Sequence, residues 1–274
     1  MKVKSIAVAL AFAGSASAMA ADMSAPTPRY AKAPAMASAY TWNGFYVGLN
    51  AGGFRSGANA NTSTTCTPAQ CYLIDTNTTN LFNSVGSQRD NPSGFIGGAQ
   101  AGFNWQINNF VAGLETDFQS FRQVGSGSSK AVYPTLAPAA FTVSQSFSTN
   151  WLWTLRPRIG IASNNWLFYA TGGVAVTEVN ANWSFLDVFA DTEAASMSRT
   201  RAGWTVGGGV EYAMFSGWSV KAEYLHLDFG NLQTTTRNLL DSGTTPVPGQ
   251  PFLHSISLRS DIFRVGVNHT FSTP

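Results

Sequence analysis

The chain has 274 residues, a net charge of +2 and only 11% charged residues. So small a net charge gives no case for nucleic-acid binding, which needs a clustered basic face. The mean hydropathy of −0.02 excludes a polytopic helical membrane protein, but it is compatible with strands whose two faces alternate between apolar and polar.

The N-terminus has the features of a secretory signal peptide. Lys2 and Lys4 form a basic start, and residues 6–13 form an apolar run too short to span a bilayer as a helix. Two A-x-A cleavage sites follow, Ala16-Ser17-Ala18 and Ala18-Met19-Ala20. We assign residues 1–20 to a cleaved signal peptide, residues 21–40, rich in Ala and Pro, to a flexible periplasmic lead, and residues 41–274 to one folded domain.

Cys66 and Cys71 are the only cysteines of the chain. In an exported protein, so close a pair is expected to form a local disulfide. A metal site would need further ligands, and no His or additional Cys lies nearby in the sequence.

Beyond the lead, the sequence repeats one pattern in which apolar and polar residues alternate with a period of two. This period is typical of β-strands with one apolar and one polar face. In the last segment, for example, Phe263, Val265 and Val267 share one face, and Arg264 and Gly266 share the other. Eight strands are predicted, at residues 42–54, 94–107, 110–124, 147–162, 166–179, 201–215, 218–229 and 261–271.

The connections between these strands alternate in length. Short turns such as Asn108-Asn109 favour tight hairpins, because Asn tolerates the positive φ that they need. The four long connections are rich in Ser, Thr, Asn and Gly and cover about residues 55–93, 125–146, 180–200 and 230–257. This asymmetry is typical of outer-membrane barrels. We therefore predict an all-β fold over residues 41–274: an eight-stranded antiparallel up-and-down transmembrane β-barrel with short periplasmic turns and four long extracellular loops.

A soluble β-sandwich is the alternative to a barrel. It would not normally have strands of ten or more residues with aromatic residues at their ends. Trp105, Trp151, Trp166 and Trp218 suit the aromatic girdles that flank a membrane-facing band. The aromatic placement favours the barrel.

The polar faces of five predicted strands carry a balanced set of charges. Unpaired charges inside a membrane-spanning shell are costly, so we expect these acids and bases to pair in the interior. Because side chains can just fill an eight-stranded barrel, the balance favours a plugged or very narrow lumen. A gated path for small solutes is the alternative. The eight residues of this charge network are Glu115, Asp117, Arg156, Arg158, Glu211, Lys221, Glu223 and Arg264.

The three histidines give little sign of chemistry. His226, His254 and His269 have no metal-ligand spacing with another His or Cys, and no cofactor is predicted. His254 could contact a planar ligand such as haem, but a solvated loop histidine is the preferred interpretation. Lipid-modifying catalysis needs a Ser nucleophile, a His base and an acid. His226 with Asp228 is the only suggestive pair, and no Ser lies beside it, so we do not expect an enzyme.

Two further features concern the strands themselves. The run Gly207-Gly208-Gly209 lies within a strand pattern without a following helix, so it is not a phosphate loop. We interpret it as relief of crowding at a barrel position. Pro157 removes one ladder hydrogen bond, and a bulge is expected there.

Several stretches together resemble a known family. They are Trp42-Asn43-Gly44-Phe45-Tyr46-Val47-Gly48 and residues 169–175, 203–212, 221–225 and 263–268. In combination they resemble the small porin-like surface proteins of alphaproteobacteria, relatives of the opacity-protein and OmpA-type barrels. The resemblance implies an eight-stranded barrel, a role in envelope integrity and contact with a host or environment through the loops. Some relatives are implicated in haem binding, but no motif for that role can be transferred to this chain.

One departure from the family lies at the C-terminus. The family usually ends at a terminal Phe that serves as an assembly signal, whereas Ser272-Thr273-Pro274 follow Phe271 here. We still take Phe271 as the assembly signal. The overhang puts the strength of its recognition in doubt.

These observations favour a structural surface protein in the outer membrane of a Gram-negative bacterium, with a plugged lumen. A narrow diffusion channel or a loop-mediated ligand-binding protein is the alternative, and a lipid-modifying enzyme is more remote. Expected partners are outer-membrane lipids and lipopolysaccharide, the barrel-assembly machinery, and host or environmental ligands of the loops. No nucleic-acid partner is expected.

Overall fold

The computed structural model describes residues 40–65, 72–73 and 76–271. These belong to one compact unit that spans residues 39–274. The predicted signal peptide, nearly all of the lead, and Cys66 and Cys71 lie outside the described residues.

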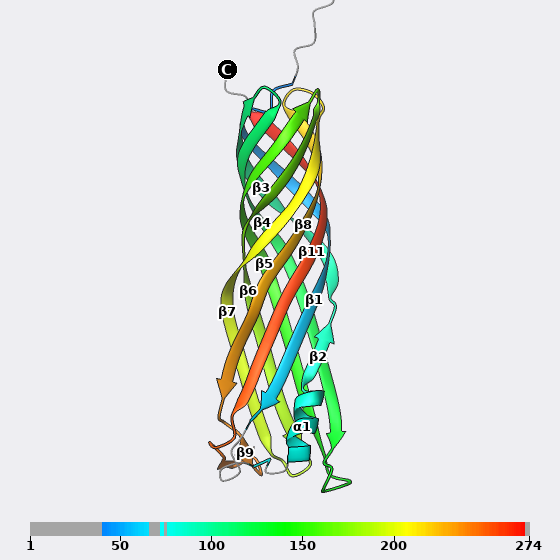
Figure 1. Cartoon of the computed structure of the whole chain (residues 1–274), viewed down its shortest axis with the longest axis vertical. Helices are drawn as coiled ribbons and strands as arrows, with labels where there is room; N and C mark the ends of the chain where they lie inside the picture. Colours follow the sequence, from blue (N-terminus) through cyan, green and yellow to red (C-terminus); the bar gives the residue numbers. More distant parts are fainter. Residues whose placement is uncertain (1–39, 66–71, 74–75, 272–274) are drawn as a thin grey trace, which may run out of the picture. The chain divides into compact units, whose positions relative to one another are not determined.

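Eight long antiparallel strands of the described chain close into a ring. Their order around it is β1-β3-β4-β5-β6-β7-β8-β11, and β11 pairs with β1 to complete the closure. Figure 1 shows these strands winding around a common axis. The eight are β1 (Gly44–Thr64), β3 (Ser93–Ile107), β4 (Phe110–Val132), β5 (Ala140–Ser163), β6 (Trp166–Asp187), β7 (Thr192–Ala213), β8 (Trp218–Thr236) and β11 (Phe252–Phe271).

Four short elements of the described residues accompany the ring. The connection after β1 contains helix α1 (Thr76–Val85) and strand β2 (Ser87–Asp90), which pairs with β1. The connection after β8 contains β9 (Leu240–Asp241) and β10 (Thr245–Pro246). Within the described chain, no helix is long and apolar enough to cross a membrane.

The strands are longer than the sequence predicted. β4 continues to Val132 and β6 to Asp187, so much of what was assigned to long connections is strand. The connection between β6 and β7 is reduced to residues 188–191. The predicted bounds of the four long connections were therefore wrong, although the ring of eight antiparallel strands was predicted correctly.

A reversal of polarity along each strand explains this error. Near the short turns, β6 places Phe168 and Ala170 outward, whereas further along the same strand Trp183 and Phe185 are buried inside the ring. The outward positions there become polar, such as Asn182. Alternation thus continues, but the apolar row moves from the outside of the barrel to the inside.

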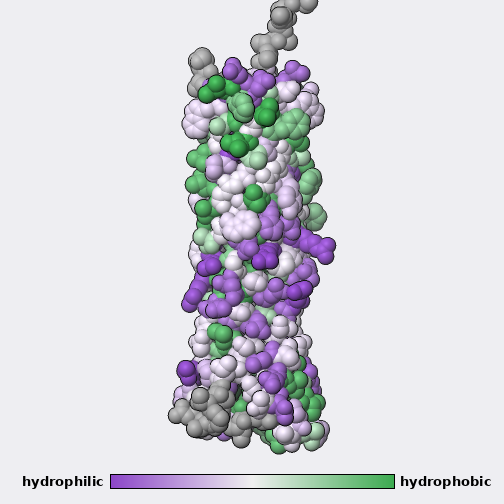
Figure 2. Space-filling model, viewed as in Figure 1, coloured by the Kyte–Doolittle hydropathy of each residue, from purple (hydrophilic) through white to green (hydrophobic). Residues whose placement is uncertain are grey.

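This reversal of polarity is expected if the strands extend beyond the membrane, so that only part of the barrel wall contacts lipid. Strands rise about 3.3 Å per residue and tilt by about 40° in such barrels, so the stretch from Phe45 to Arg55 covers about 25 Å along the axis. That is the usual height of a membrane-facing band. Figure 2 shows hydrophilic side chains gathered across the middle of the visible face, below a more hydrophobic zone in the upper part of the view.

Strand register keeps the predicted inward and outward faces. Pro157 pairs with Leu114, and the register of β5 is the same on both sides of it, so the expected bulge is absent from this stretch. Register shifts occur instead between Ser120 and Gln123 of β4, between Ser148 and Leu152 of β5, and between Ser257 and Arg259 of β11. Strand β5 therefore tolerates the missing backbone N–H of Pro157 without an inserted residue.

Helix α1 closes the end of the barrel where β1 finishes (Figure 1). Its Phe82 is fully buried, with ring centroids 5.8, 5.7 and 5.5 Å from those of Phe141, Phe185 and Phe252. These three rings come from β5, β6 and β11. Phe82 therefore fills the mouth of the ring at this end, which is the lower end in Figure 1.

Candidate functional site

All eight residues of the charge network point into the ring, and each is at most 3% exposed. They come from β4, β5, β7, β8 and β11. Alternation carries them inward, since each lies between lipid-facing neighbours such as Leu114 and Leu155. The structure brings all eight into one connected set of ion pairs.

Glu115 on β4 is the centre of this set. Its Oε1 lies 2.7 Å from Arg156 Nη2 and 2.9 Å from Lys221 Nζ, and its Oε2 lies 3.6 Å from Arg158 Nη1. The Tyr46 hydroxyl donates a hydrogen bond of 2.7 Å to Oε2. Because Lys221 is on β8, opposite β4 in the ring order, this contact crosses the whole lumen.

Two arginines bridge the acids Asp117 and Glu223. Arg264 Nη2 lies 2.5 Å from Glu223 Oε2 and 3.0 Å from Asp117 Oδ2. Arg156 contacts the same acids, at 3.4 Å from Glu223 and 2.7 Å from Asp117. Asp117 and Glu223 thus each face two guanidinium groups, an arrangement that offsets the desolvation of buried charge.

Arg158 and Glu211 complete the network toward the short turns. Arg158 Nη1 lies 3.3 Å from Glu211 Oε2. The Arg158 guanidinium also lies 4.6 Å from the ring centre of Tyr46 and 5.1 Å from that of Tyr169, which are cation–π distances. Asn268 donates a hydrogen bond of 2.7 Å to Glu211 Oε1.

The sequence reasoning missed the neutral side chains that complete this network. Strand alternation carries Tyr46 and Tyr169 to the inner face, where both are buried. In the structure their hydroxyls donate to Glu115 and Glu223, the latter at 2.9 Å. Inward tyrosines beside acidic rows were the signal that could have identified them.

His254 is not a solvated loop residue. It lies in β11, is fully buried, and its Nε2 is 3.2 Å from Glu193 Oε1. Its Nδ1 lies 3.1 Å from the hydroxyl of Thr62, and the ring of Trp183 lies 5.2 Å away. The prediction failed because β11 begins at Phe252, where the inner face is already part of the core.

His226 does not pair with Asp228. Its Nδ1 lies 2.8 Å from Asp261 Oδ1, while Asp228 accepts from Arg259 Nε at 2.9 Å. The reason is register: Asp261 of β11 lies directly opposite His226 of β8. His226 and Asp261 are partly exposed on the outer face of the barrel.

Two tyrosines fasten the connections at the mouth. Tyr133 donates a hydrogen bond of 2.8 Å to Asp187, and Tyr72 donates to Asp191. Burial, and then the bond to the Asp187 carboxylate, raise the pKa of Tyr133 well above its usual value. The pKa of Tyr72 is raised for the same two reasons, with Asp191 as the acceptor. Both phenols stay protonated donors across the physiological pH range.

Comparison with known proteins agrees with this geometry. Residues 6–240 match the family model described as the outer membrane protein beta-barrel domain. This chain belongs to that family. It is 33% identical to the 31 kDa outer-membrane immunogenic protein of Brucella melitensis, over 93% of this chain and 94% of the relative. It is 30% identical to the 25 kDa outer-membrane immunogenic protein of Brucella abortus, over 83% and 87%.

Among solved structures, the outer membrane protease OmpT from Escherichia coli covers 83% of this chain and 97% of its own, with a TM-score of 0.46 and 10% identity. The family match and the relatives place this outer-membrane β-barrel in the outer membrane of a Gram-negative bacterium.

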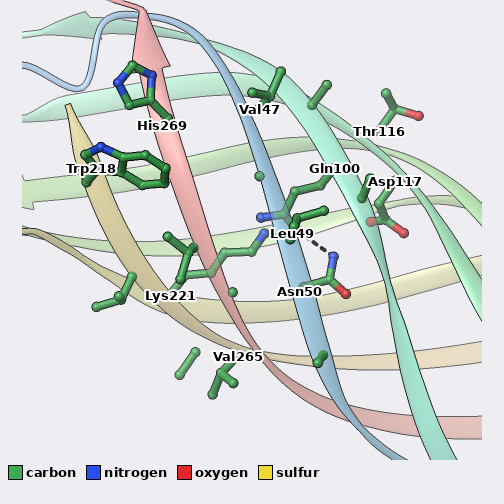
Figure 3. A pocket seen from close by; sticks show the side chains of 18 of the residues that line it. Val47, Leu49, Asn50, Gln100, Thr116, Asp117, Trp218, Lys221, Val265 and His269 are labelled. Carbon is green, nitrogen blue, oxygen red and sulfur yellow. Dashed lines mark hydrogen bonds between the residues drawn. The ribbon is translucent and has the colours of Figure 1, made fainter.

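The outer-membrane β-barrel also has a recess on its lipid-facing wall. Its volume is about 1490 Å³, and small or branched apolar residues of β1, β3 and β11 line much of it, among them Ala51, Ala99 and Val265. Figure 3 shows Val47, Leu49 and Val265 at this recess, together with polar lining residues such as Asn50. The exposed lining of the recess is mostly apolar, although Asp117 and Lys221 of the charge network also border it.

Proposed function

We propose that this outer-membrane β-barrel is a closed structural and surface protein that contributes to envelope integrity and has no catalytic role. One observation carries the proposal: the ion pair between Lys221 and Glu115 joins strands on opposite sides of the ring. A solute entering from the short-turn end meets this network across its path. Passage would require the separation of buried charges, which is costly.

Two further parts of the interior support a closed lumen. Beyond the charge network the interior contains an apolar cluster, with the fully or nearly buried rings of Phe54, Phe121 and Phe147 among its members. Phe82 of α1 then fills the mouth. Ions avoid apolar constrictions because these offer no replacement for hydration. The three layers together favour a plug over a diffusion channel.

Conductance in planar bilayers tests the closed lumen. The full mature protein, refolded and shown to be folded by its heat-modifiable mobility on gels, is expected to give a silent bilayer. Flotation with lipid vesicles under the same conditions provides the control for insertion. Reproducible open steps would contradict the plug and favour the narrow channel.

The cellular part of the proposal needs a deletion strain. We expect the deletion to raise sensitivity to detergents and bile salts, with recovery when the gene is restored. Lipid A acylation is expected to stay unchanged, because His226 and Asp261 have no serine opposite them: the neighbouring partner of His226 on β7 is Val206. A changed acylation pattern would contradict the absence of catalysis.

We also propose that the last strand provides the assembly signal and that the mouth end provides surface contacts. Phe271 is 51% exposed and lies on the lipid-facing side, with its ring 6.2 Å from that of Phe45. It is therefore accessible to an assembly machinery before the barrel closes. Replacement of Phe271 by Ala should slow the appearance of folded protein in the outer membrane. Removal of residues 272–274 should not slow it.

A further inference from the structure

Exposed apolar side chains gather at the mouth end of the barrel, at the tips of the β4–β5 and β6–β7 hairpins. This end is the lower one in Figure 1, and Figure 2 shows hydrophobic side chains at the lower right of the same view. Five large apolar side chains of these tips are between 48% and 60% exposed: Val132, Leu136, Leu186, Val188 and Phe189. We call these five residues the apolar tip.

The two hairpins present the apolar tip as one surface. The amide of Val188 donates a hydrogen bond of 3.1 Å to the carbonyl of Ala140, and Ala140 pairs with Val132. The ring of Phe189 lies 6.4 Å from that of Tyr133. An exposed apolar patch of this kind usually marks a contact with another protein or with a membrane.

The acids of these hairpins are withdrawn from the surface. Asp187 and Asp191 are both buried. Asp187 accepts a hydrogen bond of 2.8 Å from the Tyr133 hydroxyl and bonds of 2.9 Å from the amides of Phe189 and Asp191. Asp191 accepts from the amide of Ser242 at 2.7 Å. The apolar tip therefore presents no carboxylate to a partner.

A cation borders the apolar tip on one side. Lys130 is exposed and lies two residues before Val132, on the same outward face of β4. Within the described chain it forms no ion pair. On the other side, Arg237 is exposed just before β9 and Asp241 is partly exposed on it, so these two charges offset each other. The Lys130 side is therefore basic.

The membrane around the barrel does not reach the apolar tip. On the outward face of β4, Arg122 is the first charged residue beyond the lipid-facing ring of Phe118, so lipid ends near this level. Val132 lies ten residues further along the strand, which is about 25 Å along the axis at the usual rise and tilt. A lipid partner of the apolar tip must therefore belong to another cell.

We propose that the apolar tip inserts into an anionic phospholipid surface of another cell. Protein interfaces need about one hydrogen bond per 100–200 Å², and the five side chains of the apolar tip offer no hydrogen-bonding group. Burial among acyl chains stabilises such side chains, and a basic edge is attracted to anionic headgroups. The inference rests on the proposal that the mouth end provides surface contacts, and it names the partner.

Binding to vesicles provides the test. The full mature protein is reconstituted into phosphatidylcholine nanodiscs and mixed with sucrose-loaded vesicles of phosphatidylcholine that contain phosphatidylserine. The fraction that sediments with the vesicles is measured, with empty nanodiscs as the blank. Leu136→Ser/Phe189→Ser is expected to bind at least about tenfold more weakly than wild type, because two apolar side chains lose their contact with acyl chains. The control Val124→Ser/Leu253→Ser changes exposed residues away from the apolar tip and is expected to bind normally.

A second pair of variants isolates the contribution of charge. Lys130→Gln is expected to weaken binding about fivefold at low salt, the effect of one cation near an anionic surface. Arg122→Gln, on the same strand but nearer the protein's own membrane, should leave binding unchanged. Heat-modifiable mobility on gels shows that each variant is folded.

Three outcomes would overturn the inference or its choice of partner. Equal binding of wild type and Leu136→Ser/Phe189→Ser, or no binding of wild type, would remove the inference. Equal binding to neutral vesicles, or tighter binding to vesicles that carry lipopolysaccharide, would remove the anionic phospholipid surface. Association of wild-type nanodiscs without vesicles would assign the apolar tip to a second copy instead. The conductance and deletion tests do not depend on the apolar tip, so the closed lumen and the envelope role fail separately from this inference.

Discussion

Arg264 shows how much stability depends on a single buried residue of the charge network. It is fully buried and contacts both Asp117 and Glu223. Replacing it with Met leaves two carboxylates with less compensation, and we expect the free energy of unfolding to fall by about 3–5 kcal/mol. Urea unfolding in phosphatidylcholine vesicles measures the change.

The matched control is Arg259, whose pair with Asp228 is on the outside and mostly exposed on the arginine side. Arg259→Met should cost about 0–1 kcal/mol, as surface pairs usually do. Combining Arg264→Met with Glu223→Gln removes a cation together with an anion. This double variant should therefore be more stable than the sum of the single losses predicts. Equal losses at positions 264 and 259 would contradict a buried network.

Gly209 shows that some positions of the barrel wall leave no space for a side chain. A Cβ on Gly209 would lie 2.6 Å from the carbonyl oxygen of Ala222 and 2.7 Å from the Tyr169 hydroxyl. We expect Gly209→Ala to destabilise the barrel by about 1–3 kcal/mol, since tightly packed interiors tolerate added methyl groups poorly. Gly172→Ala is the control, because its nearest neighbour would be at 3.4 Å. Similar unfolding curves for both variants would show that the wall can adjust.

At the scale of elements, alternation predicted strand phase but not strand length. The phase is decided by lipid on one side and a polar interior on the other, so Val265 and Arg264 could be assigned to opposite faces from their types alone. Past the membrane that contrast reverses. Residues such as Asn182 and Trp183 then looked like a loop, because an apolar outward row was the expected sign of a strand.

Helix α1 and the buried histidine were beyond the reach of period-two reasoning. α1 lies inside a polar segment, and its apolar residues Leu81, Phe82 and Val85 at helical spacing were the only signal. This spacing becomes informative only when the aromatic rings of β5, β6 and β11 that surround Phe82 are known. Likewise, His254 contacts Glu193 and Thr62, which lie 61 and 192 positions away in the sequence, besides Thr236, which lies 18 positions away.

Because α1 fills the mouth of the ring through Phe82, we can predict the effect of loosening this helix alone. Phe82→Ala leaves a cavity among three aromatic rings, and such truncations cost roughly 3–5 kcal/mol. Because α1 lies outside the ring of strands, we expect the helix to detach while the barrel stays folded. Limited proteolysis should then cut within residues 65–92, with folded gel mobility unchanged. Ser84→Ala, at an exposed position, should resist cleavage as wild type does.

For the whole molecule, the reversal of polarity implies that the outer surface of one continuous wall contacts lipid along part of its length and water along the rest. The half near the short turns has lipid outside and charge inside. The other half has water outside and an apolar core inside, as in a soluble β-barrel. Each half obeys the same rule, which is that apolar side chains face the less polar side.

Thiol labelling along a single strand tests where this boundary lies. Ser146 and Ile159 both face outward on β5, and at about 2.5 Å of rise per tilted residue they are about 33 Å apart along the axis. In a Cys66→Ser/Cys71→Ser background reconstituted into vesicles, Ser146→Cys should react with a membrane-impermeant maleimide and Ile159→Cys should not. Both should react after solubilisation in denaturant. Protection of Ser146→Cys in vesicles would mean that lipid covers the outer half as well, and the explanation of the inverted core would then be wrong.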